Sequence, residues 1–449
     1  MISLFRRKTD KSGLYIGRLI KQGRLREELR YAASIHALTI GPNGSGKGTR
    51  LIVPNLSDLR RSIFIIDPKG EALAITGRKR ARMGRVLVIN PFGVLADEYP
   101  HMKSDGYNPL SPIDPTHDNF TDDCTSIGQA LVKEPPGNDG SFFGGSAQDL
   151  VTALVMHEKI KNGSAATLAN VRRMLTQPFD AAGLIATIAD MIESHCEPLR
   201  SKAGRFATGS RSTLDVIATA INETRFLDSP PIKRDLSGPG FDWDVMKREI
   251  VTVYLVLPAD RLETHANFLR LIVTSALRSL LRSPPSATLP PVLFILDEFA
   301  ALGYLPAVEN AMGIARGFGV QLWPILQDLN QLKALYRDRW ESFVANTGLL
   351  TAFAPNDLFT ARYLSELCGR QLRNVRTRSI SDDGRVNWSH TPHDFPRYRP
   401  EDLMRMPPGQ MLCLMSGSPM PFFTSVPGYW ATPYAEGLDP NPYFRPSAA

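Results

Sequence analysis

The stretch that most constrains the fold of this chain is HALTIGPNGSGKGTRLIVPNL, at residues 36–55. A short apolar run leads into a glycine-rich turn and then into a second apolar segment, an order that predicts a strand, a loop and a helix. Gly41, Gly44 and Gly46 let the backbone turn tightly without Cβ clashes. Several N–H groups can then point inward at the positive end of the following helix, where a polyphosphate binds.

The spacing Gly41-x4-Gly46-Lys47 fits the phosphate-loop pattern, in which the lysine contacts the β and γ phosphates of a nucleotide. The serine or threonine that usually ligates magnesium is replaced by Gly48, and Thr49 follows one position late. Either Thr49 reaches the metal or water takes its place, because magnesium keeps several waters in any case. A glycine-rich loop used only for turning is the alternative. The predicted ATP-binding residues are Gly41, Pro42, Asn43, Gly44, Ser45, Gly46, Lys47, Gly48 and Thr49.

Composition excludes several other classes of protein. With 449 residues, 43% of them apolar and 22% charged, the chain is an ordinary globular protein of two or three domains. The longest apolar run, residues 250–257, is far shorter than the roughly 20 residues of a membrane-spanning helix. The cysteines lie far apart and form no CxxC pair, so we expect buried cytosolic thiols and neither a disulfide framework nor a zinc site. They are Cys124, Cys196, Cys368 and Cys413.

The positive charge is concentrated in front of the phosphate loop. Residues 1–36 hold nine Lys or Arg against three Asp or Glu, which is nearly all of the net excess of +7. Such a basic leader could dock on an anionic membrane surface or touch nucleic acid, in both cases more weakly at high salt. A leader that is merely solvated is the alternative.

A second strong pattern is the apolar strand predicted within residues 290–306, which ends in Asp297 and Glu298. Together with the phosphate loop, this pair predicts a magnesium site and a hydrolytic centre. Asp297 would hold the metal directly or through water, and Glu298 would orient and deprotonate the attacking water. Another strand, within residues 60–74, ends in a DPKGE cluster that begins at Asp67. Asp67 either lies beside the phosphate site or caps the next helix.

Further along the chain, the strand VQLWPILQ ends at Gln327. In RecA-like motors the strand beside the metal-binding acid ends in a polar residue that senses the γ-phosphate, so Gln327 is the candidate sensor. Arg316 precedes this strand in a glycine-flanked turn. It could stabilise charge in the transition state across a subunit boundary, as an arginine finger does, or it could be a surface arginine paired with an acid.

Between residues 118 and 235 apolar residues recur at three- and four-residue steps, which predicts helices. Thr167 and Asp180 are the expected N-caps. We therefore predict an α/β fold in which the nucleotide-binding domain, residues 37–117 and 236–449, carries an all-α insert. A polar, hairpin-like stretch and a proline-rich tail follow residue 370. The insert's basic residues could face nucleic acid or a protein cargo, or could form an ordinary solvated face: Arg172, Arg173, Arg200, Lys202, Arg205 and Arg211.

Taken in order, the motifs GPNGSGKGTRLIVPNL, IIDPKGE, YNPLSPI, LDEFAALG, ARGFGVQLWPILQDLNQLKALY, FVANTG and RPEDLMRMPPGQMLCLMSGSPMP resemble the TraG/TraD family of conjugative coupling proteins of type IV secretion systems. The likeness covers residues 14–432, and the family's loop often reads GKG. It implies a hexameric RecA-like ATPase that receives single-stranded DNA bound to relaxase, or effector proteins, and delivers them to the secretion channel. Residues that match family positions of corresponding role are Lys47, Asp297, Glu298, Gln327 and Arg316.

The chain departs from the family at its start. Family members typically begin with two transmembrane helices, whereas this sequence begins almost directly at the segment LYIGRLI. Either the protein is a naturally soluble, shortened member or an anchor is missing from this sequence. A soluble member would be cytoplasmic, held at the inner membrane by a partner or by its basic leader. Two other functions compete with an ATP-driven translocase. One is a receptor that binds nucleotide and cargo but hydrolyses little, and the other is a DNA-segregation or packaging pump. The sequence does not decide whether the cargo is DNA or protein.

Overall fold

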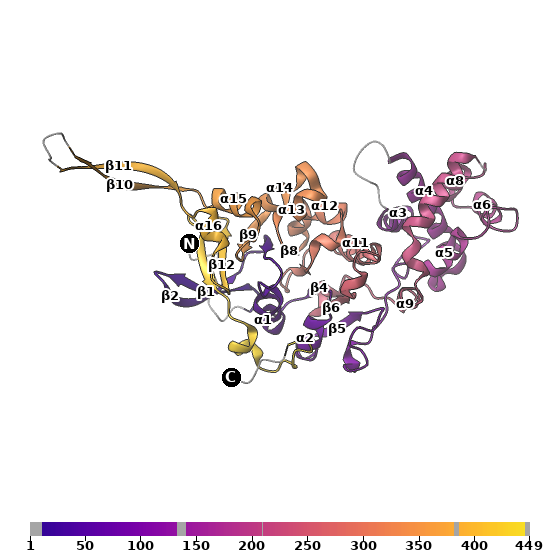
Figure 1. Ribbon diagram of the computed structural model, residues 1–449. Coiled ribbons are helices and arrows are strands. Elements are labelled where there is room, and N and C mark those ends of the chain that lie inside the picture. The colour runs from indigo at the N-terminus through magenta and orange to yellow at the C-terminus, as the bar shows by residue number, and fades with distance from the viewer. Residues whose placement is uncertain (1–10, 133–140, 209, 381–385, 445–449) are drawn as a thin grey trace. The chain divides into compact units, whose positions relative to one another are not determined.

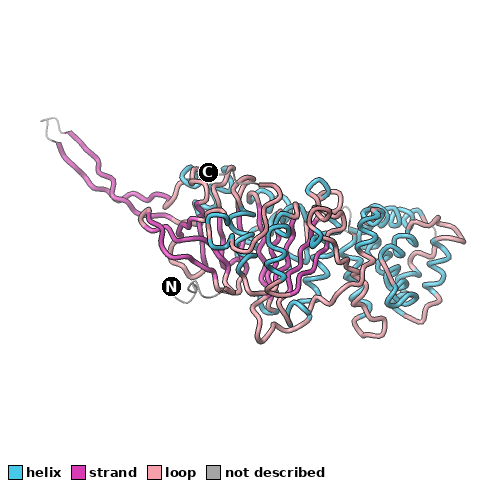
Figure 2. Tube along the Cα trace, turned by 90° about the horizontal axis from the view of Figure 1, so that it is seen from below, coloured by secondary structure: helices cyan, strands magenta, loops and turns pink. Residues whose placement is uncertain are grey.

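The computed structural model describes residues 11–132, 141–208, 210–380 and 386–444 (Figures 1 and 2). The chain divides into two compact units. Unit 1 comprises residues 1–59 and 322–436, and unit 2 comprises residues 60–321 and 437–449. The first ten residues of the predicted basic leader lie outside the described residues. Within the described part of the chain, no helix combines the length and the apolar character that crossing a membrane requires.

Unit 1 is built on a mixed sheet with the strand order β2-β1-β13-β12-β9-β3-β8. The central strand β3 is buried along its whole length and pairs in parallel with β8 and β9, while the other neighbours pair antiparallel. The phosphate loop leaves from the end of this central strand. The strands are β1 (Leu14–Lys21), β2 (Arg24–Tyr31), β3 (His36–Ile40), β8 (Val320–Leu326), β9 (Thr347–Ala352), β12 (Gln410–Met415) and β13 (Phe422–Ser425).

The helices of unit 1 begin where acidic side chains cap them. Asp328 accepts a hydrogen bond from the N–H of Gln331, and Asp357 accepts one from the N–H of Thr360. Each carboxylate satisfies an N–H group that has no partner inside its helix. The main helical segments are the π-helical turn η1 (Gly48–Ile52), α1 (Val53–Asp58), α13 (Leu329–Tyr336), α14 (Glu341–Ala345), α15 (Leu358–Leu367) and α16 (Pro400–Met404).

Unit 2 contains a parallel sheet with the order β7-β4-β6-β5. Strands β4, β6 and β7 are buried at every residue, as expected for a parallel sheet that is covered on both faces. This explains why they appear in the sequence as continuous apolar runs. The elements are β4 (Ile63–Asp67), β5 (Arg85–Ile89), β6 (Val251–Val256), β7 (Val292–Leu296), α2 (Glu71–Ala81), α10 (Val245–Arg248), α11 (Ala266–Arg282) and α12 (Pro306–Ile314).

The segment predicted as an all-α insert is also part of unit 2, and its described residues contain helices and no strand. Thr167 caps α5 by accepting from the N–H of Asn170, as predicted. The prediction of an N-cap at Asp180 is wrong, because its carboxylate accepts from the N–H of Ala182 and closes a local turn. The helices are α3 (Phe120–Leu131), α4 (Ser141–Asn162), α5 (Leu168–Leu175), α6 (Leu184–Ile192), α7 (Glu197–Gly204), α8 (Arg211–Glu223) and α9 (Pro230–Asp235).

Three basic residues of these helices hold the helices together instead of facing a partner. Arg172 is buried, and its guanidinium donates to both carboxylate oxygens of Asp228 at 2.9 and 2.5 Å. Lys202 and Arg205 each donate to one oxygen of Asp149. Each of these cations thus pairs with a carboxylate of unit 2, and Lys202 and Arg205 share one. The other basic residues considered for this segment, Arg173, Arg200 and Arg211, are exposed.

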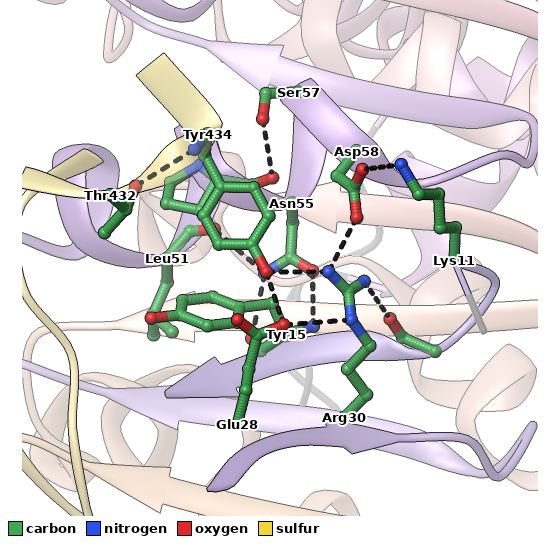
Figure 3. Close-up of polar contacts among 12 residues, drawn as sticks. Lys11, Tyr15, Glu28, Arg30, Leu51, Asn55, Ser57, Asp58, Thr432 and Tyr434 are labelled. Atoms are coloured by element: carbon green, nitrogen blue, oxygen red, sulfur yellow. Dashed lines mark hydrogen bonds and ion pairs between the residues drawn. The ribbon is translucent and has the colours of Figure 1, made fainter. Parts of the chain in front are cut away.

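A buried arginine organises the corner of unit 1 that the sequence indicated as a basic leader (Figure 3). The side chain of Arg30 on β2 is 1% exposed. Its guanidinium donates to Asp58 at 2.6 Å, to the hydroxyl of Tyr434 at 2.8 Å and to Glu28 at 3.3 Å. Lys11 forms a second ion pair with Asp58 at 2.7 Å. This cluster joins β2, the end of α1 and the C-terminal part of unit 1. Residues 14–31 are therefore strands of the unit 1 sheet, while the side chains of Arg18, Lys21, Arg24 and Arg26 are exposed.

We expect Arg30→Ala to lower the free energy of unfolding by about 3 kcal/mol, because it removes the buried guanidinium, leaves Glu28 without this cation and leaves Asp58 with Lys11 alone. Urea unfolding followed by tryptophan fluorescence measures this difference. Arg24→Ala removes an exposed arginine from the same strand and should change the free energy by less than about 0.5 kcal/mol. Equal losses in the two variants would show that the buried cluster contributes nothing specific.

Candidate functional site

The phosphate loop of unit 1 is fixed at its start by two backbone hydrogen bonds. The N–H of Gly41 donates to the carbonyl of Leu326 at 2.9 Å, and the N–H of Phe353 donates to the carbonyl of Ile40 at 2.9 Å. The loop therefore begins between the ends of β8 and β9. Gly46 has a φ of +85°, and a Cβ there would lie 2.7 Å from Nε of Arg50. Only glycine meets both conditions without strain.

Inside this loop the structure shows the features that a polyphosphate needs. Lys47 is only 8% exposed, and its ammonium donates to the carbonyls of Gly41 at 2.5 Å and Pro42 at 3.4 Å. The hydroxyl of Ser45 is buried and has no hydrogen-bond partner among the described residues. A buried hydroxyl without a partner is costly, and a phosphate oxygen would supply the missing acceptor. The residues present therefore fit a bound nucleotide.

The structure also shows the surroundings of Gly48, which stands where a phosphate loop usually has serine or threonine. A Cβ at Gly48 would meet no described atom within 4 Å, so the glycine is not required by crowding. The hydroxyl of Thr49 donates to the carbonyl of Gly46 at 3.5 Å and so points back at the loop. Whether Thr49 or water completes the coordination of a magnesium ion stays a prediction.

Gln327 lies at the same edge of the unit 1 sheet as the loop. It follows directly after β8, and Leu326 pairs with Ile40 in the parallel register of β8 and β3. Its backbone N–H donates to the side chain of Gln331 at 3.0 Å, which holds the strand end against the first turn of α13. The structure thus brings the predicted sensor beside the loop within one unit.

The two predicted carboxylates follow the buried strand β7 of unit 2. Glu298 has φ 48° and ψ 45°, a left-handed conformation that is uncommon for any residue other than glycine. Its N–H donates to the carboxylate of Asp297 at 3.1 Å. A conformation of this kind costs roughly 1–3 kcal/mol and is found mainly at functional sites, where the surrounding structure enforces it. The backbone therefore supports a functional role for this pair.

Asp67 caps a helix, which is one of the two roles that its sequence context allowed. Its carboxylate, at the end of β4, accepts from the N–H of Leu73 in α2 at 2.8 Å. Burial raises the pKa of this carboxyl group to about 6, and hydrogen bonds from backbone N–H groups oppose the shift. The register pairs Ile66 with Leu296, so Asp67 and Asp297 follow neighbouring strands at one edge of the unit 2 sheet.

The C-terminal segment of unit 2 covers the DPKGE turn, a contact that the sequence did not indicate. The side chain of Asn441 donates to Glu71 at 2.6 Å, and the hydroxyl of Tyr443 donates to the carbonyl of Lys69 at 2.8 Å. The proline-rich tail therefore has a structural role in unit 2.

Arg316 lies in an exposed turn, η7 (Ala315–Phe318), immediately before β8. The carbonyl of Arg316 accepts from the N–H of Gly319 at 3.2 Å, which closes the turn. Its exposure fits a residue that reaches outward, and its role as a finger stays a prediction. The predicted site residues are divided between the units, with Lys47, Thr49 and Gln327 in unit 1 and Asp297, Glu298 and Arg316 in unit 2.

Comparison with known proteins supports one family. A family model described as type IV secretory system conjugative DNA transfer matches residues 2–422. VirD4 of Agrobacterium fabrum is 27% identical over 393 residues, which are 86% of this chain and 57% of that protein. TraG of Escherichia coli is 26% identical over 424 residues, which are 88% of this chain and 66% of that protein. The chain therefore spans little more than half the length of VirD4 and two thirds of TraG.

Solved structures of the conjugative coupling protein TrwB have the same fold. The unbound form has a TM-score of 0.65 at 15% identity and covers 92% of this chain and 88% of its own. The complex with the ATP analogue ADPNP has a TM-score of 0.67 at 15% identity, with 94% and 95% covered. A further TrwB structure is a complex with ADP and Mg2+. At this identity the likeness concerns the fold, and it confirms the predicted RecA-like α/β class.

The raised pKa of Asp67 leads to a pH-dependent prediction. Between its ordinary pKa of 3.8 and the folded value of about 6, the folded protein binds more protons than the unfolded chain. Asp67 therefore makes the protein less stable as the pH rises through this range. Asp67→Asn does not titrate and can still accept from the N–H of Leu73. We compare the free energy of unfolding of Asp67→Asn with that of the wild type at each pH. The difference, variant minus wild type, should be about 1 kcal/mol larger at about pH 7.5 than at about pH 5.

Urea unfolding at both pH values tests this expectation. Asp97→Asn makes the same change at an exposed position, and its difference from the wild type should not vary with pH. A difference for Asp67→Asn that is equally independent of pH would contradict the raised pKa.

Proposed function

Because this chain belongs to the type IV secretory system conjugative DNA transfer family, we propose that it is an ATP-driven coupling protein. It would recruit DNA with its bound relaxase, or effector proteins, and deliver them to a secretion channel at the cytoplasmic face of the membrane. The observation that carries the proposal is the phosphate loop, in which Lys47 is buried and the hydroxyl of Ser45 has no partner among the described residues. A loop used only for turning would need neither feature.

The loop and β8 supply the binding half of the reaction. Lys47 neutralises the β and γ phosphates, and the loop N–H groups and Ser45 hold their oxygens. Gln327, which directly follows β8, would sense whether the γ-phosphate is present. ATP and Mg2+ are the expected ligands, in agreement with the TrwB complexes that hold ADPNP or ADP with Mg2+.

The segment after β7 supplies the hydrolytic half. Asp297 would hold the magnesium ion, with Thr49 or a water molecule as another ligand. Bound magnesium neutralises charge that develops on the phosphates. Glu298, which has a left-handed backbone directly after β7, would accept the proton of the attacking water. Hydrolysis then drives cargo transfer.

Lys47→Ala should weaken nucleotide binding, because it removes a charge that contacts phosphates in the ground state. Glu298→Gln should keep the affinity and lower turnover by roughly 100-fold or more, because the carboxylate acts on water only during reaction. Titration with a fluorescent ATP analogue and a phosphate-release assay, with and without single-stranded DNA, measure the two effects. Glu263→Gln alters an exposed carboxylate and should change neither value. Normal turnover in Glu298→Gln would refute its assignment as the base.

We further propose that the working form is a homo-hexameric ring and that Arg316 reaches the nucleotide of the neighbouring subunit. A finger supplied in this way accounts for roughly 10³ to 10⁵ in rate. Specific activity should therefore rise with protein concentration, or with DNA that nucleates the ring. Arg316→Ala should keep nucleotide affinity and lose that rise.

Mixing Arg316→Ala with Lys47→Ala protein tests the contact between subunits. Some interfaces in the mixture pair an intact loop with an intact finger, so activity should be partly restored. Arg234→Ala, an exposed arginine elsewhere in unit 2, serves as the matched control. If turnover per subunit is independent of concentration and Arg316→Ala is silent, Arg316 is only a surface residue.

A further inference from the structure

Unit 1 carries a two-stranded ribbon that lies apart from its main sheet. Strand β10 (Arg370–Ile380) pairs antiparallel with β11 (Val386–Pro396) along its whole length. Figure 1 shows the ribbon extending away from the other elements of unit 1, beyond α15 and α16, and Figure 2 shows the same extension from below. The prediction of a hairpin-like stretch beyond residue 370 is thereby confirmed. Because an isolated two-stranded ribbon is marginally stable in water, a binding partner would stabilise it.

The pairing register shows which side chains share a face of the ribbon. Alternate residues of a strand point to the same side, and directly paired residues lie on the same side. Arg376 pairs with His390, and Arg378 pairs with Trp388. These four residues therefore form one surface, which we call the Arg–Trp face. Arg373 and its partner His393 belong to the opposite face.

The Arg–Trp face combines positive charge with an exposed aromatic ring. The guanidinium carbon of Arg376 lies 3.8 Å from the centre of the Trp388 indole ring, a cation–π contact. Trp388 is nevertheless 49% exposed. On a ribbon that extends away from the other elements of unit 1, this half-exposed indole is accessible to a partner (Figure 1).

The arginines of this face differ from those of the helical segment in their surroundings. The two strands contain four arginines and a single acidic residue, Asp394. Asp394 forms an ion pair with Arg370, the arginine at the base of the ribbon. Among the described residues of the two strands, no carboxylate pairs with Arg376 or Arg378, whereas Arg172 is paired with Asp228.

We propose that the Arg–Trp face binds single-stranded nucleic acid, with a base stacked on Trp388 and backbone phosphates on Arg376 and Arg378. Proteins that hold single strands without sequence preference combine these same two features, basic side chains and aromatic platforms. The inference names a cargo surface for the proposed coupling function and in that respect rests on it.

The chemistry of the face favours a single strand over other partners. A duplex offers phosphates but keeps its bases stacked, so the indole would gain nothing from it. A second copy of the ribbon would bring arginine against arginine, because basic residues on an edge strand oppose pairing with an identical edge. A single strand offers phosphates to Arg376 and Arg378 and an accessible base face to the indole of Trp388.

Fluorescence anisotropy with a labelled oligothymidylate of about 20 nucleotides tests the proposal on the full chain. Arg376→Ala/Arg378→Ala should weaken binding and reduce the slope of log K against log salt by about 1.4, because each lost phosphate contact accounts for about 0.7 on a single strand. Trp388→Ala should weaken binding roughly 5- to 100-fold and leave that slope unchanged. Trp388→Phe keeps an aromatic face and should recover much of the loss.

Arg362→Ala/Arg405→Ala is the matched control, because it removes two exposed charges from α15 and the end of α16 in the same unit. Its binding should stay close to wild type, and an equal loss would show that net charge alone acts. Circular dichroism and ATP-analogue affinity verify that each variant is folded. Wild-type affinity in the ribbon variants overturns the inference, as does a preference for duplex of the same length. It is also overturned if these variants change only vesicle binding or oligomeric mass.

The same measurements separate this inference from the proposed function. If ATP turnover depends on Glu298 but the ribbon variants bind DNA as tightly as the wild type, the inference fails while the proposed coupling ATPase stands. If the ribbon variants lose DNA binding in a protein that does not hydrolyse ATP, the binding surface stands and the motor function fails.

Discussion

The hydrogen bond from the N–H of Gly41 to the carbonyl of Leu326 fixes the site on which the rest of unit 1 depends. It continues the parallel register of β3 and β8 by one residue, and so it sets both the start of the phosphate loop and the position of Gln327. Lys47 then donates to the carbonyl of the same Gly41. Strand register, loop conformation and the position of the cation are thus coupled through one residue, Gly41, and an error in register would displace all three.

The parallel strands could be predicted from the sequence because burial on both faces gives continuous apolar runs, as in β4 and β7. The strands at the edge of the unit 1 sheet, β1 and β2, could not be predicted in this way. Only the last three residues of β2 are buried, and β1 pairs with β13, a strand some four hundred residues away in the chain. Strands β12 and β13, which lie in the proline-rich tail, could not be predicted for the same reason. Their pairing partners are distant, so no local pattern identifies them.

The spacing of glycine and lysine identified the loop residues, since phosphate binding imposes that spacing on neighbouring residues. Contacts between distant segments left no such signal. Asp67 could have been a site residue or a helix cap, and only the N–H of Leu73 distinguishes the two. The contact of Asn441 with Glu71, which holds the C-terminal segment on the DPKGE turn, joins residues 370 positions apart.

The surroundings of individual arginines also could not be predicted from the sequence, and the structure distinguishes them. In the sequence, Arg30, Arg172 and Arg376 are equivalent members of basic stretches. In the structure, Arg30 is buried against Asp58 and Arg172 against Asp228, so each arginine is paired with a carboxylate of its own unit. Arg376 instead stacks on Trp388, an arrangement that retains its full positive charge. The nearest carboxylate, more than the number of basic residues in a segment, therefore determines which arginines can meet an anionic partner.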